Sequence, residues 1–322
     1  MDMNIVMIVL AALAVLVLVT CYICYRMAFY AQRKPVDESV MPLPKGRIYE
    51  PYYPQMRQWM EELRAMPCEE MEITSFDGLR LHARFYEYAP GASIELMVHG
   101  YRGTAEGDLC GGVQRCFSLG RSVLLVDQRT SGKSEGHTIT FGINESRDCA
   151  AWARLLVERF GEDVQIIITG ISMGASTVLI AAGYEDLPEQ VVGVIADCGF
   201  SSAKEIIQKV MVKMHFPPRL MYPFVKLAAR LFGHFDLEER TALEAAKRCH
   251  LPVFFIHGED DRFVPCDMSR RCYEACCAPK HLFTVPEAGH GIAYIMDTAG
   301  YVRALTEFSC ANGIPIAPAA ER

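Results

Sequence analysis

The chain has 322 residues, of which 51% are hydrophobic, and this size and composition favour one large α/β domain with additions over two small domains. A net charge of −7 and a pI near 5.8, with no basic stripe, exclude proteins that bind nucleic acid through a basic surface. The 13 cysteines make neither a zinc-ligand pattern nor a tidy disulfide framework, so we expect no metal site and a reducing compartment.

The first element is an uncharged apolar run from Ile5 to Tyr25. Its 21 residues, at about 1.5 Å each, cover roughly 30 Å, which is the thickness of the hydrocarbon core of a bilayer. A cleaved signal peptide fits less well, because no Lys or Arg precedes the run and no Ala-x-Ala site follows it. A buried core helix rarely stays uncharged for so long. We therefore expect residues 1–34 to form a single-pass transmembrane anchor with its flank.

The charges around this run predict its orientation. Asp2 is the only charged side chain before it, whereas Arg26, Arg33 and Lys34 follow it. Because basic residues are enriched on the cytoplasmic side of membrane helices, we expect the rest of the chain to lie in the cytoplasm. The large number of cysteines agrees with that compartment.

Residues 35–70 connect the anchor to the rest of the chain. The stretch from Pro35 to Pro54 is rich in proline and predicts a stiff linker or a strap along the main domain. Apolar side chains then recur at helical spacing opposite charged ones, which predicts an amphipathic helix packed on that domain. These apolar residues are Met56, Trp59, Met60 and Leu63.

From Met71 onward, strand patterns alternate with helical ones. The first two strands flank an Asp77-Gly78 turn and predict an antiparallel hairpin, and the later ones are continuous runs typical of strands buried on both faces. We expect eight strands, at residues 71–76, 79–88, 94–98, 123–126, 166–169, 191–196, 253–256 and 282–285. Helical stretches lie at 148–160 and 175–182. This alternation predicts a mostly parallel sheet with helices on both faces.

Fifty residues, 201–250, interrupt the alternation between the sixth and seventh strands. They are rich in apolar helix formers, and Pro217-Pro218 and Pro223 should break them into pieces. Their place just past the strand ends suits a small helical lid over a site. Ordinary crossover helices would show the same composition, so this alternative stays open.

A Gly-x-Ser-x-Gly pattern from Gly170 to Gly174 stands between the fifth strand and the helix after it. A serine at such a bend is held in a strained backbone conformation, and side chains two positions before and after it would collide, so both positions need glycine. The bend should expose the Ser172 hydroxyl. It should also point the Met173 N–H at the same spot, where an oxyanion can be stabilised.

A nucleophilic serine needs a histidine base, and the base needs a carboxylate. Loops after later strands offer both, because Glu259-Asp260-Asp261 follows the seventh strand and His290 lies between glycines after the eighth. The order of serine, acid and histidine therefore predicts a catalytic triad. The residues alone leave open which acid serves, and Asp197 at the end of the sixth strand is an alternative.

With the His99-Gly100 turn, the Asp127-Gln128-Arg129 segment and the His-Gly-x-x-Asp motif that begins at His257, these features resemble the α/β-hydrolase superfamily from about Met71 to Ala311. The nearest resemblance is to membrane-anchored bacterial serine hydrolases related to the prolyl-oligopeptidase-like and monoacylglycerol-lipase-like branches. The resemblance implies an α/β-hydrolase domain over 71–311, followed by a tail at 312–322.

The same resemblance assigns roles to residues. It implies Ser172 as nucleophile, Asp261 as acid and His290 as base, with the backbone N–H groups of Tyr101 and Met173 as oxyanion donors. No metal or organic cofactor is implied. One departure is Thr130-Ser131, where relatives usually have Gly-His, and we expect this loop to lie away from the triad.

The expected activity is hydrolysis of carboxylic or lipid esters through an acyl-enzyme, by a protein whose N-terminal helix holds it at a membrane. A serine peptidase or aminopeptidase is the alternative, and a non-catalytic binding protein on the same fold is a further one. Other polar residues have simpler interpretations: His99 and His257 as structural turn residues, and His137 and His215 as loop or lid residues. Arg102 could bind a substrate carboxylate or face solvent.

Overall fold

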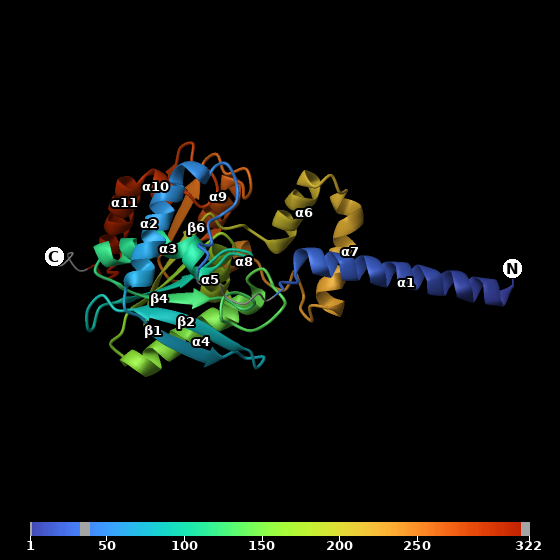
Figure 1. Cartoon of the computed structure of the whole chain (residues 1–322), viewed down its shortest axis with the longest axis horizontal. Coiled ribbons are helices and arrows are strands. Elements are labelled where there is room, and N and C mark those ends of the chain that lie inside the picture. Colours follow the sequence, from blue (N-terminus) through green and yellow to red (C-terminus); the bar gives the residue numbers. More distant parts are fainter. Residues whose placement is uncertain (1, 33–38, 317–322) are drawn as a thin grey trace.

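Eight strands form one sheet at the centre of the protein (Figure 1). The computed structural model describes residues 2–32 and 39–316. The strand order is β1-β2-β4-β3-β5-β6-β7-β8, and only β2 runs antiparallel to its neighbours. The strands are β1 (Glu69–Thr74), β2 (Arg80–Tyr86), β3 (Ile94–Val98), β4 (Ser122–Asp127), β5 (Ile166–Ile171), β6 (Val191–Asp197), β7 (Val253–Gly258) and β8 (Lys280–Val285). The expected eight-stranded, mostly parallel sheet with an antiparallel first pair is confirmed.

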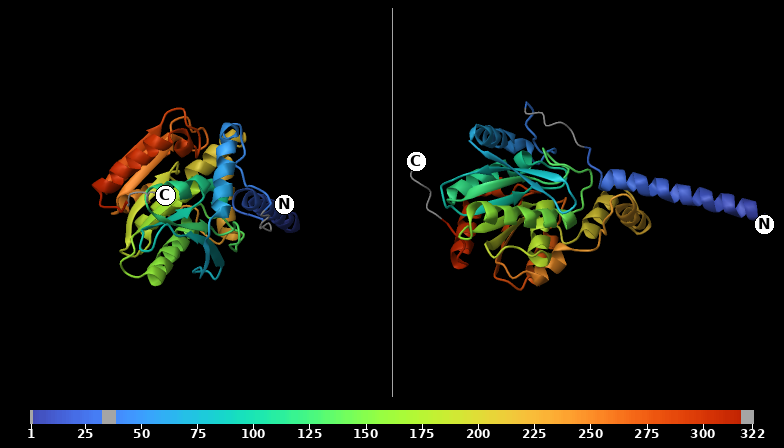
Figure 2. Two further views of the ribbon diagram at one scale, coloured as in Figure 1. Left: turned by 60° about the vertical axis from the view of Figure 1, so that its left-hand side comes forward. Right: turned by 90° about the horizontal axis from the view of Figure 1, so that it is seen from below.

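Helices cover both faces of this sheet (Figures 1 and 2). The first face carries α4 (Ile143–Phe160), α5 (Met173–Tyr184), α8 (Ala242–Arg248) and α9 (Cys266–Ala275). The second face carries α2 (Tyr53–Ala65), α3 (Ala105–Ser118), α10 (Ala293–Met296) and α11 (Thr298–Ala311). Two buried hydrophobic layers result, one against each face. Because β3 to β8 run in one direction, the loops that follow them gather at one edge of the sheet.

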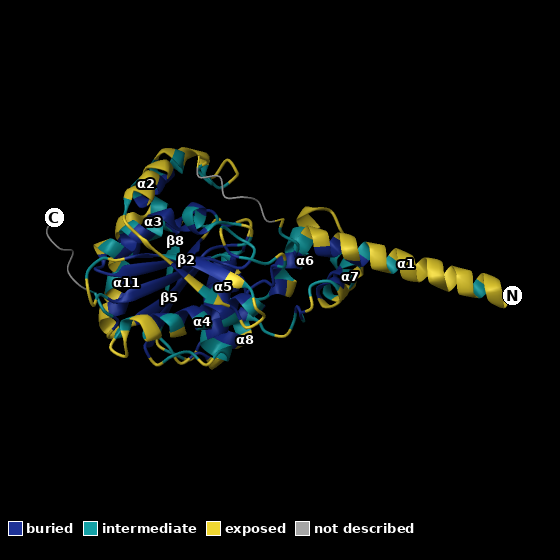
Figure 3. Ribbon diagram, turned by 60° about the horizontal axis from the view of Figure 1, so that its bottom comes forward, coloured by how far each residue is buried: buried dark blue, intermediate teal, exposed yellow. Residues whose placement is uncertain are grey.

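One long helix, α1 (Met3–Ala28), projects from the domain (Figure 3). Its length and composition are those of a helix that can cross a membrane. Most of its side chains are exposed, but Cys21, Cys24 and Tyr25 near its end are buried against the domain. Arg33 and Lys34, which the predicted orientation also used, lie outside the described residues.

The interrupting stretch contains three helices with different surroundings. Helix α8 packs on α5 within the first hydrophobic layer, as an ordinary crossover helix does. Helices α6 (Ala203–Lys213) and α7 (Pro218–Leu231) instead stand beyond the strand ends, and α7 packs on α1 (Figure 1). The lid interpretation therefore concerns α6 and α7 alone, which we call the cap (residues 203–231).

The break expected at Pro223 is wrong. Helix α7 begins at Pro218 and continues through Pro223 to Leu231. A proline inside a helix removes one backbone hydrogen bond. Here Pro223 is exposed while its neighbours Tyr222 and Val225 are buried, so packing on either side of the proline holds the helix together.

Residues 39–52, which we call the strap, run along the second face to η1 (Glu50–Tyr52) and α2. Leu43 of the strap packs into the hydrophobic layer there, and the Tyr53 hydroxyl donates to the Pro44 carbonyl at 2.7 Å. Helix α2 buries Met56, Met60 and Leu63, three of the four residues of the predicted apolar face. Residues 35–38 of the expected linker lie outside the described residues.

Candidate active site

The turn from β5 into α5 holds Ser172 in an unusual backbone conformation, with φ of 57° and ψ of −117°. A Cβ added at Gly170 would lie 2.1 Å from the carbonyl carbon and oxygen of Gly174. A Cβ added at Gly174 would lie 2.2 Å from the carbonyl oxygen of Val98 on β3. Neither atom fits, so both glycines are required for the backbone to bend here, as the sequence predicts.

Three side chains from three loops meet at this turn. His290 Nε2 lies 2.9 Å from Ser172 Oγ, and His290 Nδ1 lies 2.6 Å from Asp261 Oδ2. Because a carboxylate only accepts hydrogen bonds, the Nδ1–H must donate to Asp261. The Nε2 atom is then left without a proton and can accept from the Ser172 hydroxyl, which is the tautomer that a general base needs.

The Asp261 carboxylate is held by more than His290. Its Oδ1 accepts from the backbone N–H groups of Phe263 and Val264, at 2.9 and 2.8 Å. His257 Nε2 lies 3.3 Å from Oδ2. Burial alone would raise the pKa of Asp261, but hydrogen bonds from His257 and His290 outweigh burial and hold that pKa well below its usual range. Asp261 is therefore a fixed anion beside the histidine.

The other three candidate acids lie elsewhere. Glu259 is exposed and pairs with Arg270 at 3.4 Å. Asp260 is exposed and pairs with Arg262 at 3.1 Å. Asp197 is buried at the end of β6, where its backbone carbonyl accepts the Ser172 N–H at 2.8 Å. Burial raises the pKa of the Asp197 carboxyl, and its Oδ1 has no hydrogen-bond partner within the described part of the chain. Among these four acids, Asp261 is the one that contacts His290.

The loop after β3 lies against Ser172. A Cβ added at Gly100 would lie 3.3 Å from Ser172 Cβ, so Tyr101, the next residue, is near the serine. Met173 is the first residue of α5, and its N–H belongs to a helix N-terminus, where backbone donors favour negative charge. Both expected oxyanion donors thus come from segments that border Ser172.

Comparison with known proteins agrees with this geometry. Residues 96–231 match the family model described as alpha/beta hydrolase fold. A solved structure, the esterase Pf2001 of Pyrococcus furiosus, superposes with a TM-score of 0.65 at 20% identity, over 88% of this chain and 98% of that one. The chain therefore has the α/β-hydrolase fold.

Two curated proteins are similar to this chain in sequence. The uncharacterized protein YqkD of Bacillus subtilis is 30% identical over 193 residues, which are 60% of this chain and 63% of that protein. The uncharacterized protein Rv2307c of Mycobacterium tuberculosis is 24% identical over 288 residues, 88% of this chain and 86% of the other. The match to YqkD thus spans less than two thirds of that relative.

Three further residues near Ser172, Asp261 and His290 were not found by sequence reasoning. Asp108 Oδ2 accepts the Gly100 N–H at 2.9 Å and occupies the space that a Cβ at Gly103 would need. Cys198 Sγ lies within 4.8 Å of ligand atoms of Asp261 and His290. The strap reaches the site as well, because a Cβ added at Gly289 would lie 3.1 Å from Ile48. Burial, and after it the charges of Cys198, Asp261 and Asp108, raise the pKa of the next strap residue, Tyr49. The sequence offers one weak indication for each: Asp108 and Cys198 follow predicted strands, and Tyr49 lies in the proline-rich stretch.

Cys198, Asp261 and His290 offer a thiol, a carboxylate and an imidazole in a small space, which invites comparison with a metal site. A metal needs the thiolate, whereas burial and the nearby charges of Asp197 and Asp261 raise the pKa of Cys198. Asp261 and His290 are also hydrogen-bonded to each other. The three residues therefore fit a protonated thiol packed beside a hydrogen-bonded Asp261–His290 pair better than a set of metal ligands.

The loop with the unusual Thr130-Ser131 pair contacts the turn after β3. Ser131 Oγ donates to the Gly103 carbonyl at 2.8 Å, in the same turn that carries Tyr101. Ser131 thus supports this turn from outside, and the expectation that the loop lies away from the triad stays a prediction.

Arg102 is exposed, and its guanidinium group also binds the backbone at the end of α1. Its Nη2 donates to the carbonyls of Met27 and Tyr30, at 2.9 and 3.1 Å. The neighbouring Tyr101 hydroxyl donates to the Ala28 carbonyl at 2.8 Å. The turn that carries Tyr101 and Arg102 therefore holds the carbonyl end of α1, which a cation stabilises.

The other four histidines singled out in the sequence, all among the described residues, make no hydrogen bond to Ser172, and three of them have hydrogen-bond or stacking partners. His99 Nε2 accepts the Gln128 N–H at 3.1 Å, and His257 Nδ1 lies 2.7 Å from Ser269 Oγ. His137 stacks on the Tyr30 ring, and His215 is exposed between α6 and α7.

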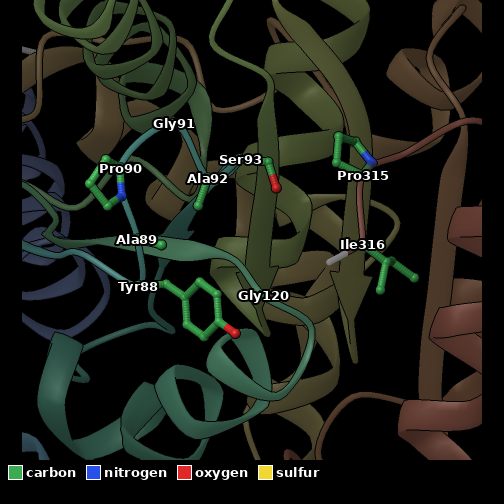
Figure 4. A pocket seen from close by; sticks show the side chains of 9 residues that line it. All are labelled: Tyr88, Ala89, Pro90, Gly91, Ala92, Ser93, Gly120, Pro315 and Ile316. Carbon is green, nitrogen blue, oxygen red and sulfur yellow. The ribbon is translucent and has the colours of Figure 1, made fainter. Parts of the chain in front are cut away.

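A separate hollow of about 350 Å³ lies at the amino end of β3, the edge opposite Ser172 (Figure 4). It is lined by Tyr88, Ala89, Pro90, Gly91, Ala92, Ser93, Gly120, Pro315 and Ile316. No charged side chain is among these lining residues. It therefore offers no charged acid or base for catalysis.

Proposed function

We propose that the protein is a membrane-anchored serine hydrolase that cleaves carboxylic or lipid esters. The observation that carries the proposal is the chain of contacts from Ser172 Oγ through His290 to Asp261 at a strained turn. Strain at a single non-glycine residue persists only where the surroundings enforce it, and such residues cluster at active sites.

The proposed reaction has two halves. His290 removes the Ser172 proton as the serine oxygen attacks the ester carbonyl, and the N–H groups of Met173 and Tyr101 stabilise the oxyanion that forms. Protonated His290, stabilised by Asp261, then gives its proton to the leaving alcohol, and an acyl-enzyme remains. Water, activated by His290, releases the acid and restores the serine.

The acidic side chains just after the cap favour esters over peptides as substrates. An aminopeptidase needs an acid free to bind a substrate ammonium group. Asp236 pairs with Arg230 at 2.6 Å, Glu238 lies 3.4 Å from Lys204, and Glu239 lies 2.9 Å from Arg147. All three acids that could have formed such a pocket are thus engaged with basic side chains.

The proposal is tested by fluorophosphonate labelling of the purified full-length protein, followed by a substrate panel. We expect the probe to label Ser172, and acyl esters to be hydrolysed at least about 100-fold faster than aminoacyl anilides. Faster cleavage of the anilides would identify a peptidase instead. A folded protein that takes up no probe and hydrolyses neither class would be a binding protein on this fold.

We further propose that α1 anchors the enzyme with its catalytic domain in the cytoplasm. Arg26 lies in the last turn of α1, on the domain side, as the positive-inside tendency requires. All 13 cysteines are free thiols, which fits a reducing compartment.

The orientation is tested with a membrane-impermeant maleimide on intact cells. Cys68, Cys277 and Cys310 are exposed and report on the domain. We expect them to react only after lysis, because the membrane would shield them. Equal labelling before and after lysis would put the domain outside.

A further inference from the structure

The last turns of α1 are part of the domain rather than of a free helix. Cys21, Cys24 and Tyr25 are buried, and the rings of Tyr22 and Tyr25 lie 5.4 and 5.9 Å from the ring of Phe232, just after α7. The Tyr25 hydroxyl also lies 2.8 Å from Thr138 Oγ1. Together with the Arg102 and Tyr101 contacts, these fix where α1 leaves the domain.

The length of helix that remains free limits where a membrane can lie. Eighteen residues from Met3 to Thr20 precede the buried part, which at about 1.5 Å each measure roughly 27 Å. A bilayer has a hydrocarbon core of about 30 Å. If α1 spans this core, all of its free residues lie inside the membrane. The part of the domain that packs beside Cys21 must then lie at the lipid surface.

The structure packed beside Cys21 is the cap, and its outer face is apolar. In α7, Leu220, Leu227 and Leu231 are exposed along one side, while Tyr222, Val225 and the two alanines after Leu227 are buried on the other. Further exposed apolar side chains of α6 and the turn after it are Val212, Met214 and Phe216. An exposed apolar face of this size marks a contact surface rather than a solvated one.

The orientation of the cap matches the direction of α1. In Figure 1, α7 crosses α1, and it lies farther from the sheet than α6, on the side toward which the free part of α1 projects. An amphipathic helix lying across a membrane-spanning one has the geometry of an interfacial helix. Exposed Arg219 and Arg230 lie beside Leu220 and Leu231 at the two ends of the apolar stripe, and Lys213 is exposed at the end of α6, as basic residues are at lipid headgroups. Arg230 also pairs with Asp236.

We propose that the outer face of the cap is inserted into the lipid leaflet that α1 enters from the domain side. The inference rests on the proposed function for its consequence, which is that the substrates are lipid esters taken from that leaflet. The cap side chains Ile207 and Val225 share one buried hydrophobic cluster with Met173, the residue after Ser172. An acyl chain that leaves the leaflet by way of the cap therefore meets apolar side chains up to the nucleophile.

The location of the cap is tested in the full-length protein in phosphatidylcholine vesicles. Leu227→Trp puts an emitter on the proposed face, and Val40→Trp, at an exposed valine of the strap, is the matched control. We expect lipids brominated along their acyl chains to quench the added Leu227→Trp emission by about half, and Val40→Trp emission hardly at all. Equally weak quenching of both would put the cap in water and overturn the proposal. Quenching that disappears as the protein-to-lipid ratio rises would assign the face to a second copy, which also overturns it.

The consequence for substrates is tested with the Leu220→Glu/Leu227→Glu double variant and a Val40→Glu control. Hydrolysis of a long-chain ester embedded in the vesicles should fall about tenfold or more in the double variant, because charges resist insertion. Hydrolysis of a water-soluble acetyl ester should stay within about twofold. Equal loss on both esters would contradict entry from the leaflet. If the wild-type protein cleaves neither ester, the proposed function fails, while the quenching experiment still decides where the cap lies.

Discussion

Replacing Ser172 with alanine is expected to lower ester hydrolysis by about 10⁴-fold or more. The variant keeps His290 and Asp261 but lacks the oxygen that would form the acyl-enzyme. What remains is the small catalysis that substrate binding and the oxyanion donors supply to attack by water.

The measurement is kcat/KM on one activated ester, for protein whose thermal melting matches the wild type. The fold should persist, because Ser172 Oγ contacts His290 and is only partly buried. Ser118→Ala is the matched control, since that hydroxyl donates to the Arg115 carbonyl on α3, away from the site, and its loss should cost less than about twofold. Hydrolysis that survives unchanged in a pure, folded Ser172→Ala protein would show that the serine is not the nucleophile.

The second large effect separates neighbouring acids. Asp261→Asn should lower kcat by about 10³–10⁴-fold. An asparagine amide can donate to His290 Nδ1, which would move the histidine proton to Nε2 and leave no base facing Ser172. The new side chain can still accept from the Phe263 and Val264 N–H groups, so the loop should keep its shape.

Asp260→Asn is the control that the chain itself offers, one residue away. Its partner is Arg262 at the surface, and surface ion pairs contribute little, so kcat should change by less than about twofold. Both variants are measured on the same activated ester with melting curves. A large loss for Asp260→Asn beside a near-normal Asp261→Asn would reverse the assignment of the acid.

Asp261 should also make the stability of the fold depend on pH. The pKa of Asp261 is held below its usual range, so its charged contacts stabilise the fold above the unfolded carboxyl pKa of about 4. That contribution is lost only as the pH falls toward the lower, folded-state pKa. Asp261→Asn should therefore destabilise the protein at neutral pH more than at acidic pH.

Much of this architecture follows from local sequence patterns. The strands are continuous apolar runs, and their observed positions differ from those expected by a few residues at most, as at β8 (Lys280–Val285 against 282–285). Gly170 and Gly174 were also predicted correctly as required, because neighbouring backbone atoms leave no room for a side chain at either position. Helix α4 begins earlier than expected, at Ile143, because Glu145 caps its start by accepting the Gly142 N–H.

Contacts between segments that are distant in the chain were predicted poorly or not at all from the sequence. A glutamate in a predicted central strand, Glu95, is fully buried because Arg115 and Arg121 approach it from outside the strand. Arg102, whose partner was undecided, holds the end of α1. Both arrangements depend on the positions of other helices and loops in the fold, which the spacing of apolar residues along one segment does not predict.

The sequence by itself determined the sheet, the turn that exposes Ser172, and the order of serine, acid and histidine, because each depends on the conformation of a few consecutive residues. Only the tertiary structure decided which carboxylate reaches His290, that Asp108 and Cys198 lie beside the site, and that the end of α1 packs on the cap. These are distances between side chains far apart in the chain, and they are fixed by packing of whole elements rather than by any local pattern.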